Sequence, residues 1–503
     1  MSVLRPRPEL DDRATRAAGH RWPALVVCLV GGFMTLLDVS IVNVALPSIR
    51  SGLRMSEGGL QWVLSGYALA FGLVLVPAGR LGDAHSRRAV FISGLALFTA
   101  TSALAGAAQS EAWLVIARLA QGLAGGLLVP QVAGFIQQLF QGPERGRAFG
   151  MLGATIGLSM AVGPLLGGLL IEGFGAAEGW RWVFYVNLPI GLLTLPLALR
   201  LLPGPALARA PAVPDPSVRP AGATRLTTRP RRDFDPVGVL LLGLGTVLLL
   251  LPFVQEQQWH GWTKWLLLPA AAALLAAFTG WERHYGRTRE PLVSMDLFEQ
   301  RSYSLGTLVS LLYFAGFTAI FFIFTLYLQS GLGYSALEAG LAITPFALGS
   351  GTAAAVGGRL VQRMGRPLVT GGLLLVELGL LLAAAAVHLW SGPSIGWLTA
   401  GPLLLAGIGS GLVVAPNQTL TLGDVPVIRA GSAAGVLQTA QRIGSAAGIA
   451  AVGSVFFPWV TEHGEDWAGA FQAGMAVAVG FVLLALLTAL ADALGRRPGG
   501  TAG

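Results

Sequence analysis

The sequence contains little charge and almost no cysteine. Only 12% of its 503 residues are Asp, Glu, Lys or Arg, whereas 54% are hydrophobic. Because a soluble globular chain carries about twice that share of charged residues, this composition indicates a polytopic membrane protein. The single cysteine, Cys28, excludes an intrachain disulfide and any CxxC metal or redox motif.

Lysine is nearly absent as well. Lys264 is the only one, so the phosphate-binding pattern GxxxxGK[ST] cannot occur and ATP is not bound by such a loop. The six histidines and 25 acidic residues form no HExxH, and no GxSxG nucleophile elbow is present. We therefore predict neither an enzyme nor a metal or cofactor site.

What the sequence has instead is a series of long apolar runs. Each can cross a bilayer, which takes about 20 helical residues. Hydropathy places the runs near 25–49, 60–80, 89–108, 112–139, 148–171, 182–202, 236–254, 262–282, 304–329, 336–358, 367–388, 395–420, 431–457 and 467–493. The sequence thus predicts an all-α integral membrane protein with 14 transmembrane helices in groups of six, two and six.

Polar segments divide the chain around these groups. The predicted parts are an N-terminal tail at 1–23, a six-helix half at 24–202, a Pro- and Arg-rich linker at 203–235, two inserted helices with a loop at 236–303, a second six-helix half at 304–493 and a C-terminal tail at 494–503. The linker has few large apolar residues, which is typical of disorder.

The basic residues predict how the chain is oriented. The net charge is +8, and the loops on the side of the N-terminus carry 27 Arg or Lys against four on the other side. This bias places both termini and the linker in the cytoplasm of a protein in the cell membrane. It also explains the high pI without a nucleic-acid partner.

An internal repeat relates the two six-helix groups. GRLGDAHSRR at 79–88 recurs as GRLVQRMGRP at 358–367, each after the second span of its group. At an offset of 285 residues, glycines of the two fifth spans also correspond: 146, 150, 163 and 168 match 431, 435, 448 and 453. We predict two pseudo-symmetric halves related by an axis along the membrane normal.

One acid lies deep inside the first span. At 1.5 Å per residue, Asp38 is about 20 Å from an entry near Leu25, too deep for its carboxylate to reach water. Such an acid should face a bundle interior or a wet cavity and is a candidate proton carrier. The alternative is a structural carboxyl that hydrogen-bonds to Asn43 or Ser40.

An arginine lies inside the fourth span. Arg118, Gln121, Gly122 and Gly125 share one helical face at spacings i, i+3, i+4 and i+7. An arginine on a glycine-lined interior face is a poor packing residue, so we interpret Arg118 as functional. The alternative is a structural partner for backbone carbonyls.

The repeated decapeptide contains a charge cluster where two helices nearly touch. Gly79 permits close approach, while Asp83 can accept hydrogen bonds from the next helix and pair with Arg87 or Arg88. An ordinary topogenic loop is the alternative. The segment resembles the cytoplasmic signature of the major facilitator superfamily, which latches two halves together. It departs from that signature at Ala84 and Ser86, and its second copy has Gln362 in place of the acid, so only the first half should carry the charge switch.

The fifth span combines glycines with a proline. Gly163, Pro164, Gly167 and Gly168 form the order GPxxGG, in which the proline removes a helical hydrogen bond and bends the helix. Packing alone is the alternative, because membrane helices often contain Gly and Pro. This order resembles the antiporter signature of proton-driven exporters, and its second-half counterpart has Ile449 in place of the proline.

Two longer strings resemble one family within that superfamily. LLDVSIVNVALPSI in the first span and GWRWVFYVNLPIG at 179–191 are similar to signatures of the fourteen-span drug/proton antiporters. The resemblance implies a proton-coupled exporter of amphipathic, preferably aromatic compounds that works by alternating access. It also implies that Arg118 acts with an acid in proton coupling.

Further residues are candidates for the substrate cavity. They are Asn43 and Gln121 in the first half and Tyr313, Phe317, Asn417, Gln418, Gln438, Gln441 and Arg442 in the second. Aromatic residues in a span are more often packing residues, whereas buried amides beside an arginine are harder to explain by packing. Glu377 is a second acid candidate and ranks below Asp38, because the third helices of each half lie outside the cavity in the superfamily.

Two other functions fit the same residues. The chain could export a metabolite of its own cell as a self-resistance pump, or be a non-transporting membrane receptor on a transporter-like frame. The expected partners are a small amphipathic molecule, protons and the bilayer, and we expect a monomer.

Overall fold

The computed structural model describes residues 8–175, 177–204, 235–254, 259, 261–390 and 392–494. Most of the predicted linker, at 205–234, lies outside this set, as do both chain ends. Throughout the described ranges the chain is helical and has no β-strand. The all-α class predicted from the sequence is therefore confirmed.

The helices follow the predicted spans closely. In the first part of the chain they are α1 (Pro8–Leu53), α2 (Glu57–Leu81), the π-helical turn η1 (Gly82–Ser86), α3 (Arg87–Gly106), α4 (Glu111–Leu139), α5 (Gly142–Phe174), α6 (Gly179–Tyr185) and α7 (Asn187–Leu201). The inserted pair is α8 (Pro236–Val254) and α9 (Leu267–Tyr285), with η3 (Trp262–Leu266) before α9. The remainder are α10 (Asp296–Glu299), α11 (Arg301–Leu326), η4 (Tyr327–Gly331), α12 (Ala336–Met364), α13 (Arg366–Leu389), α14 (Ile395–Leu398), α15 (Ala400–Thr421), η5 (Val427–Arg429), α16 (Ala430–Glu462) and α17 (Trp467–Leu494).

Local sequence explains several helix ends. Ser56 and Ser110 cap the first turns of α2 and α4 by accepting from the backbone amides of Gly59 and Trp113. At α12, Ser335 and Glu338 form a reciprocal capping box. That helix ends where Gly365 adopts φ 59°, a conformation that favours glycine.

Thirteen stretches of the described chain are long and apolar enough to cross a membrane. The longest, Gly58–Gly106, contains both α2 and α3. The helix α2 runs parallel to α4, because Tyr67 approaches Gly122 and Phe71 approaches Gly126. The helix α3 runs antiparallel to α4, because Gly94 approaches residue 127 and Ser102 approaches residue 121. The chain therefore reverses at η1. The count of 14 crossings stays a prediction.

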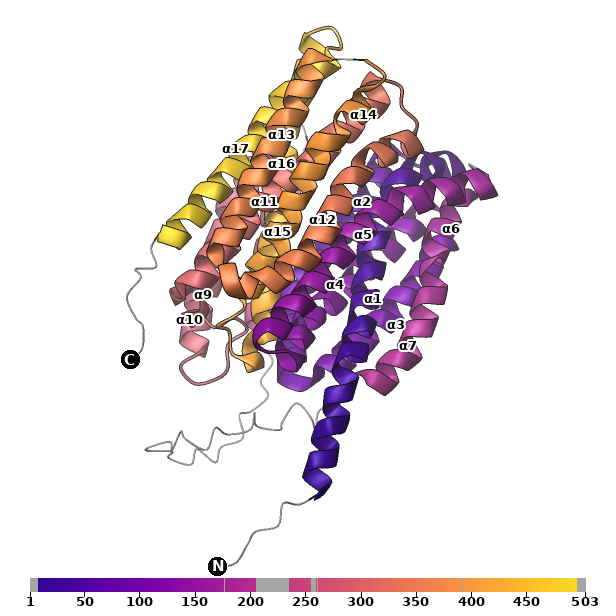
Figure 1. The fold of residues 1–503 in the computed structure, drawn as a ribbon. Helices are drawn as coiled ribbons and strands as arrows, with labels where there is room; N and C mark the ends of the chain where they lie inside the picture. Colours follow the sequence, from indigo (N-terminus) through magenta and orange to yellow (C-terminus); the bar gives the residue numbers. More distant parts are fainter. Residues whose placement is uncertain are drawn as a thin grey trace, which may run out of the picture.

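Two helical groups lie side by side in Figure 1, one formed by α1–α7 and the other by α11–α17. They meet through glycines, where backbones touch. Gly79 of α2 packs on Gly431 of α16, and Gly146 of α5 packs on Gly358 of α12. Each copy of the repeated GRL segment thus contacts the fifth spanning helix of the opposite half, as a pseudo-twofold arrangement requires.

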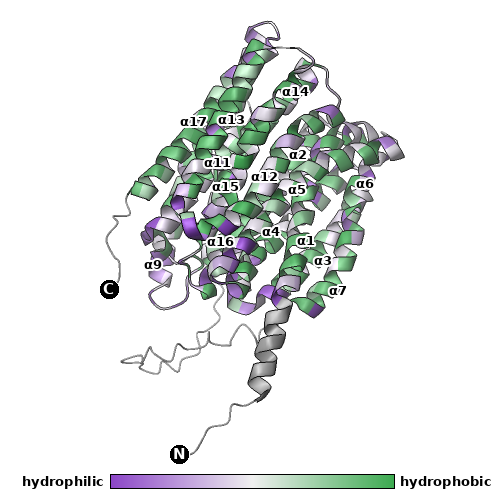
Figure 2. Ribbon diagram, viewed as in Figure 1, coloured by the Kyte–Doolittle hydropathy of each residue, from purple (hydrophilic) through white to green (hydrophobic). Residues whose placement is uncertain are grey.

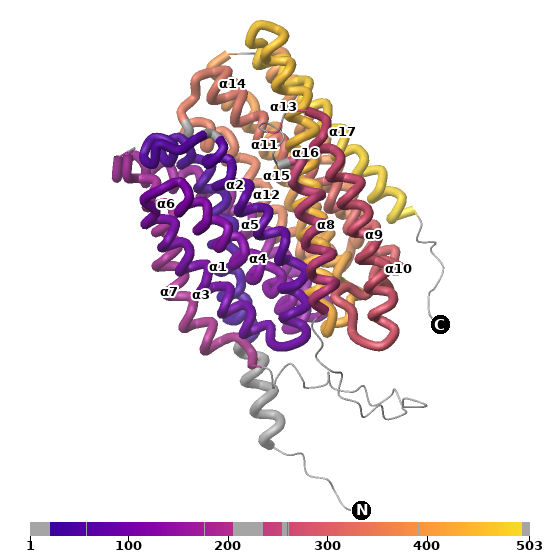
Figure 3. The backbone as a smooth tube through the Cα atoms, turned by 180° about the vertical axis from the view of Figure 1, so that it is seen from behind, coloured from indigo at the N-terminus to yellow at the C-terminus, as the bar shows by residue number. Residues whose placement is uncertain are grey.

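The inserted helices α8 and α9 lie on the outside of the bundle, beside α16 (Figure 3). Gly72 of α2 faces Leu250 of α8, and Gly243 of α8 faces Leu73 of α2. At one end, Val76 of α2 and Val436 of α16 pack in the same apolar cluster as Phe278 of α9. The inserted pair therefore covers the seam between α2 and α16.

Apolar residues cover most of the helical surface, and polar residues gather towards the ends (Figure 2). Ile116 and Leu193 illustrate the outer surface, at 65% and 70% exposed. We call the end that holds η1 and the α4–α5 and α15–α16 turns the latch end. The first side chains of α1 and the end of α17 lie there, since Arg21 pairs with Glu144 and Arg366 pairs with Asp492.

The glycine contacts predict which small substitutions the fold tolerates. A methyl group at Gly358 would overlap the carbonyl oxygen of Gly146 and lie 2.7 Å from the Gly150 Cα, whereas one at Gly371 of α13 meets nothing within 4 Å. We expect Gly358→Ala to destabilise the folded protein by about 1–3 kcal/mol, the usual cost of overpacking. Gly371→Ala should leave stability unchanged or slightly raised.

Thermal unfolding of the two purified variants in detergent checks this. Gly371→Ala is the matched control, because it adds the same methyl group to another spanning helix. Equal melting temperatures for the two variants would show that the α5–α12 contact is looser than described.

Candidate functional site

Asp38 and Arg118 form an ion pair inside the first half. The Arg118 Nη1 atom lies 2.6 Å from Asp38 Oδ2, and the two side chains are 1% and 0% exposed. Asp38 comes from the middle of α1 and Arg118 from α4. Removing one partner of a buried ion pair leaves an unpaired charge and destabilises a folded protein by about 3–5 kcal/mol. Each of the two side chains therefore stabilises the charge of the other.

Three polar side chains complete the surroundings of the carboxylate. Gln121 Nε2 donates to Asp38 Oδ1 at 2.9 Å and to Ser102 Oγ at 3.1 Å, and its own Oε1 accepts from Arg118. Asn187, the first residue of α7, donates to Asp38 Oδ1 at 3.2 Å and to Ser102 at 3.0 Å. The carboxylate is thus held by donors from α4 and α7.

Arg118 is also held by an aromatic ring and a backbone carbonyl of α2. Its guanidinium carbon lies 4.2 Å from the centre of the Tyr67 ring, and its Nε donates to the Val63 carbonyl at 3.1 Å. Tyr67 is 3% exposed, yet its hydroxyl has no hydrogen-bond partner. Four helices therefore converge on one ionised pair.

The structure brings Asp38, Arg118 and Gln121 together. The resemblance implied that Arg118 acts with an acid, whereas Gln121 was predicted only for the substrate cavity. Neither Ser40 nor Asn43 binds Asp38: Ser40 faces Gly163 of α5, and Asn43 is exposed. The alternative interpretation of Asp38, as a structural carboxyl, named Ser40 and Asn43 as its hydrogen-bond partners. They are not its partners in this conformation.

Sequence reasoning missed Asn187, Ser102 and Tyr67. Asn187 had a signal, because it is a polar residue two positions before Pro189 within the apolar string VFYVNLPIG. Ser102 and Tyr67 carry no signal, since serine and tyrosine are common in spanning helices.

A second polar cluster joins the two halves at the latch end. Asp83 Oδ1 accepts from Arg87 Nη2 at 2.7 Å and from the Gly431 amide at 3.1 Å, while its Oδ2 accepts from the Ser432 amide at 2.9 Å. The carboxylate thus caps the N-terminus of α16, where the helix dipole favours an anion. Arg87 also donates to the Val427 carbonyl across the same boundary. Arg88, by contrast, donates to the Leu199 carbonyl within the first half.

The second copy of the repeat makes a different set of contacts. Arg366, which corresponds to Arg87, lies 2.7 Å from Asp492 of α17 and donates to Asn417 at 2.8 Å. These partners all belong to the second half. Asn417 is buried with Arg366 at the latch end and is therefore remote from the Asp38 network.

The GPxxGG segment lies between one helix of each half. Gly163 and Gly167 face Ser40 and Ile41 of α1, whereas Pro164 faces Gly340 of α12. Gly168 faces Leu337 of α12 at van der Waals distance. The helix α5 continues through Pro164 without interruption.

The remaining candidates line the interior of the second half. Tyr313 stacks on Phe317 with ring centres 5.3 Å apart, and Phe317 borders a cavity of about 20 Å³ between α5, α11, α12 and α15. Gln418 and Gln438 are buried, and the Oε1 of each lacks a partner. On α16, Gln441 and Arg442 are partly accessible. Glu377 lies on α13, which packs on α15 and α17, away from Asp38.

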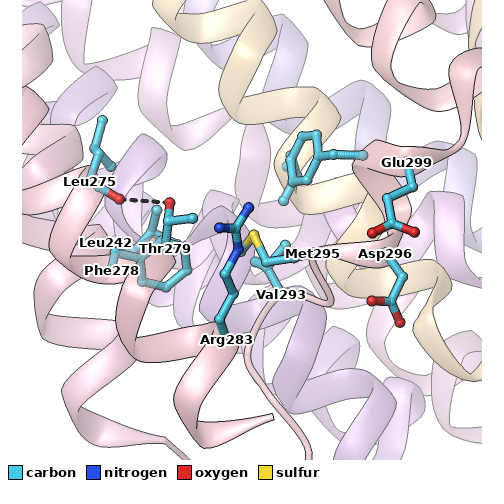
Figure 4. Close-up of a pocket in the computed structure, with 11 residues that line it drawn as sticks. Leu242, Leu275, Phe278, Thr279, Arg283, Val293, Met295, Asp296 and Glu299 are labelled. Atoms are coloured by element: carbon cyan, nitrogen blue, oxygen red, sulfur yellow. Dashed lines mark hydrogen bonds between the residues drawn. The ribbon is translucent and has the colours of Figure 1, made fainter. Parts of the chain in front are cut away.

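A larger cavity, of about 660 Å³, lies outside this interior (Figure 4). It is bordered by α8, α9, α10 and α16, and Arg283 projects into it between Phe278 on one side and Asp296 and Glu299 on the other. Sequence reasoning gave no sign of it, because its walls come from the inserted helices and the following loop. Among the described residues, no three His, Cys, Asp or Glu side chains gather as metal ligands.

Comparison with known proteins adds to this geometry. The sequence profile of the Major Facilitator Superfamily matches residues 28–449. A probable actinorhodin transporter of Streptomyces coelicolor is 36% identical over 456 residues, covering 90% of this chain and 75% of that protein. The multidrug resistance protein Stp of Mycobacterium tuberculosis is 33% identical over 442 residues, 87% of this chain and 76% of that protein.

The fold is also shared with solved structures. The proton:xylose symporter XylE superposes with a TM-score of 0.61 over 93% of this chain and 95% of that one, at 16% sequence identity. At this identity the likeness concerns the fold alone.

The latch makes a testable prediction. Asp83→Asn removes the anion that pairs with Arg87 and caps α16, so we expect the latch end to open more often. The reporter is Ser350→Cys in a Cys28→Ser background, because Ser350 lines the small cavity between α5, α11, α12 and α15. The rate of labelling by a membrane-impermeant maleimide is measured in vesicles of both orientations. In Asp83→Asn this rate should rise several-fold when the reagent is added on the latch side, and should not change when it is added on the other side.

Glu144→Gln is the matched control. Glu144 also pairs with an arginine at this end, but Arg21 belongs to the same half. Equal labelling of all three proteins would mean that Asp83 does not hold the halves together.

Proposed function

Because the chain belongs to the Major Facilitator Superfamily, a family of membrane transporters, we propose that it is a proton-coupled exporter of amphipathic compounds. It would work by alternating access of its two halves in the cell membrane. The observation that carries the proposal is the enclosed Asp38–Arg118 pair. Burying a carboxylate in a spanning helix costs free energy, and such residues are typically functional.

The surroundings of Asp38 suit a proton that binds and leaves. As an anion, the carboxylate satisfies donors of Arg118, Gln121 and Asn187. Protonation removes the charge that neutralises Arg118, so the pair must separate and the guanidinium must find another partner. Proton binding would therefore favour a different arrangement of α1 against α4.

Contacts of α1 suggest how that rearrangement reaches the other half. Ser40 follows Asp38 by two residues and packs on Gly163 of α5. The next residue of α5, Pro164, packs on Gly340 of α12. A shift of α1 would thus press on α5 at the point where it meets the second half.

The structure is closed at the latch end. Described hydrogen bonds between the two halves lie there, such as Gln137 to the Leu422 carbonyl and Arg145 to the Gly423 carbonyl. At the opposite end, Ser56 bonds to Glu111 within the first half. We assign this arrangement to the state that exchanges protons with the side opposite the latch.

A self-made compound is the second candidate for the substrate. The observation that favours it is the 36% identity to a protein named as a probable actinorhodin transporter. Self-resistance and multidrug export share the same mechanism, so they differ only in which compounds enter the cavity. Survival of cells with and without the gene, on foreign drugs and on their own products, separates the two.

Replacing the titrating group tests the proposed coupling. Asp38→Asn keeps the size and part of the hydrogen bonding but cannot carry a proton. We expect proton-driven export from inverted vesicles to fall at least 100-fold, with normal amounts of protein in the membrane. Substrate-induced proton release, followed with a pH dye in detergent, should vanish too.

Glu377→Gln provides the comparison, because it removes a second intramembrane acid that lies on α13. It should retain export and proton release. If Asp38→Asn still exports against a gradient and releases protons while Glu377→Gln does not, Glu377 is the coupling site. Wild-type export that persists after a protonophore would exclude proton coupling altogether.

A further inference from the structure

Arg442 lies in the interior without an acid to balance its charge. Its guanidinium carbon lies 4.5 Å from the centre of the Phe71 ring, and within the described residues it has neither a hydrogen bond nor an ion pair. Arginine keeps its charge in proteins. A cation–π contact repays only part of the cost of burying it.

Three buried acids of the described helices are already paired with other arginines. Asp38, Asp83 and Asp492 pair with Arg118, Arg87 and Arg366, respectively. Glu377 projects from α13, which does not pack on α16. Among the described residues, therefore, no acid pairs with Arg442 to neutralise its charge.

Four side chains connect this charge to the Asp38 network across the boundary between the halves. Arg118 lies over Tyr67, Tyr67 and Phe71 have ring centres 5.9 Å apart, and Arg442 lies over Phe71. The two arginines are thus separated by two aromatic rings of α2. A charge bound at Arg442 is close enough to be felt at Tyr67 and beyond it.

Unused polar groups surround Arg442. Among the described residues, the buried Tyr67 hydroxyl has no hydrogen-bond partner, and the Tyr67 ring neighbours Phe71, over which Arg442 lies. Gln438 is one helical turn before Arg442, is 7% exposed and has an unpartnered Oε1. One turn after it, Ser445 bonds to Thr318, the neighbour of Phe317. The Tyr67 hydroxyl is thus an unused donor near Arg442, and the Ser445–Thr318 contact places α11 beside the same stretch of α16.

We propose that Arg442 binds the acidic group of the substrate, and that the exported compounds are aromatic acids. The guanidinium would hold the carboxylate or ionised phenol, with the Tyr67 hydroxyl as a further donor and the α11 rings of Tyr313 and Phe317 against the ring system. This proposal rests on the proposed exporter function and specifies its substrate class. Asp38 does not select a cationic substrate, because Arg118 neutralises it and no surface of its side chain is exposed.

The proposal fixes the charge moved in each cycle. One proton entering and one monoanion leaving carry two positive charges inward, whereas exchange with a neutral compound carries one. A membrane potential of about 60 mV, interior negative, changes the equilibrium gradient about tenfold for each charge. Such a potential alone should support about a 100-fold gradient of the acid and about a tenfold gradient of a neutral analogue.

The test compares anthraquinone-2-carboxylic acid with its methyl ester. Equilibrium dialysis with the purified full-length protein should show at least tenfold tighter binding of the acid. Arg442→Gln should remove that difference by weakening the acid alone, whereas Arg442→Lys should retain much of it. In proteoliposomes without a pH gradient, accumulation of the acid should depend on the potential twice as steeply as that of the ester.

Arg283→Gln is the matched control, because Arg283 is also without a described acidic partner but projects into the outer cavity. It should leave the preference for the acid intact. Equal binding of acid and ester by the wild type overturns the proposal, and so does equal weakening of both in Arg442→Gln. Loss of the preference in Arg283→Gln alone would place the acid in the outer cavity and overturn it as well.

The outcomes separate this proposal from the exporter function. If neutral or cationic dyes are exported with proton coupling while the acid is not bound, the function stands and the assignment of Arg442 fails. If the acid binds through Arg442 but no compound crosses the membrane under any gradient, the binding site stands and the exporter function fails.

Discussion

The rest of the structure depends on how an ionised pair is kept in a low-dielectric interior. A charge in a spanning helix costs at least about 2.5 kcal/mol, and the cost is offset only if hydrogen bonds satisfy the whole group. Around Asp38 that is achieved by Arg118, Gln121 and Asn187, which come from three positions in the sequence. The four helices that carry the network therefore cannot move independently while it is intact.

The halves are held by a second constraint, which is steric. Where Gly79 meets Gly431 and Gly146 meets Gly358, backbones are in contact, so a rotation of one half must break the contact as a unit. Asp83 reinforces the first of these two contacts, and among the described residues no acid bonds across the second. The latch is thus symmetric in packing and asymmetric in charge, which places the electrostatic control on the α2–α16 side.

The spanning helices could be predicted from the sequence, because membrane helices are recognised by their length and hydropathy. Asp38 and Arg118 stood out for the same physical reason, since charges are rare where water is absent. Asn187 did not stand out, because burying an uncharged amide costs less free energy than burying a charge, so an amide can occur in a spanning helix for packing alone. Asp492 did not either: it lies near the end of α17, where an acid ordinarily faces water, and only the fold shows that it is 2% exposed beside Arg366. Contacts between distant segments decide such cases.

Arg118 and Arg442 differ in how their charge is balanced. Arg118 is neutralised by an acid of its own half, while Arg442 has an aromatic ring and unpartnered polar groups around it. Since the rings of Tyr67 and Phe71 join the two positions, a change of charge at one alters the field at the other without any contact between acid and ligand. An anion bound at Arg442 would favour a proton at Asp38 through this field, so an exchange of the two must come from the different conformations that they favour and not from electrostatic competition.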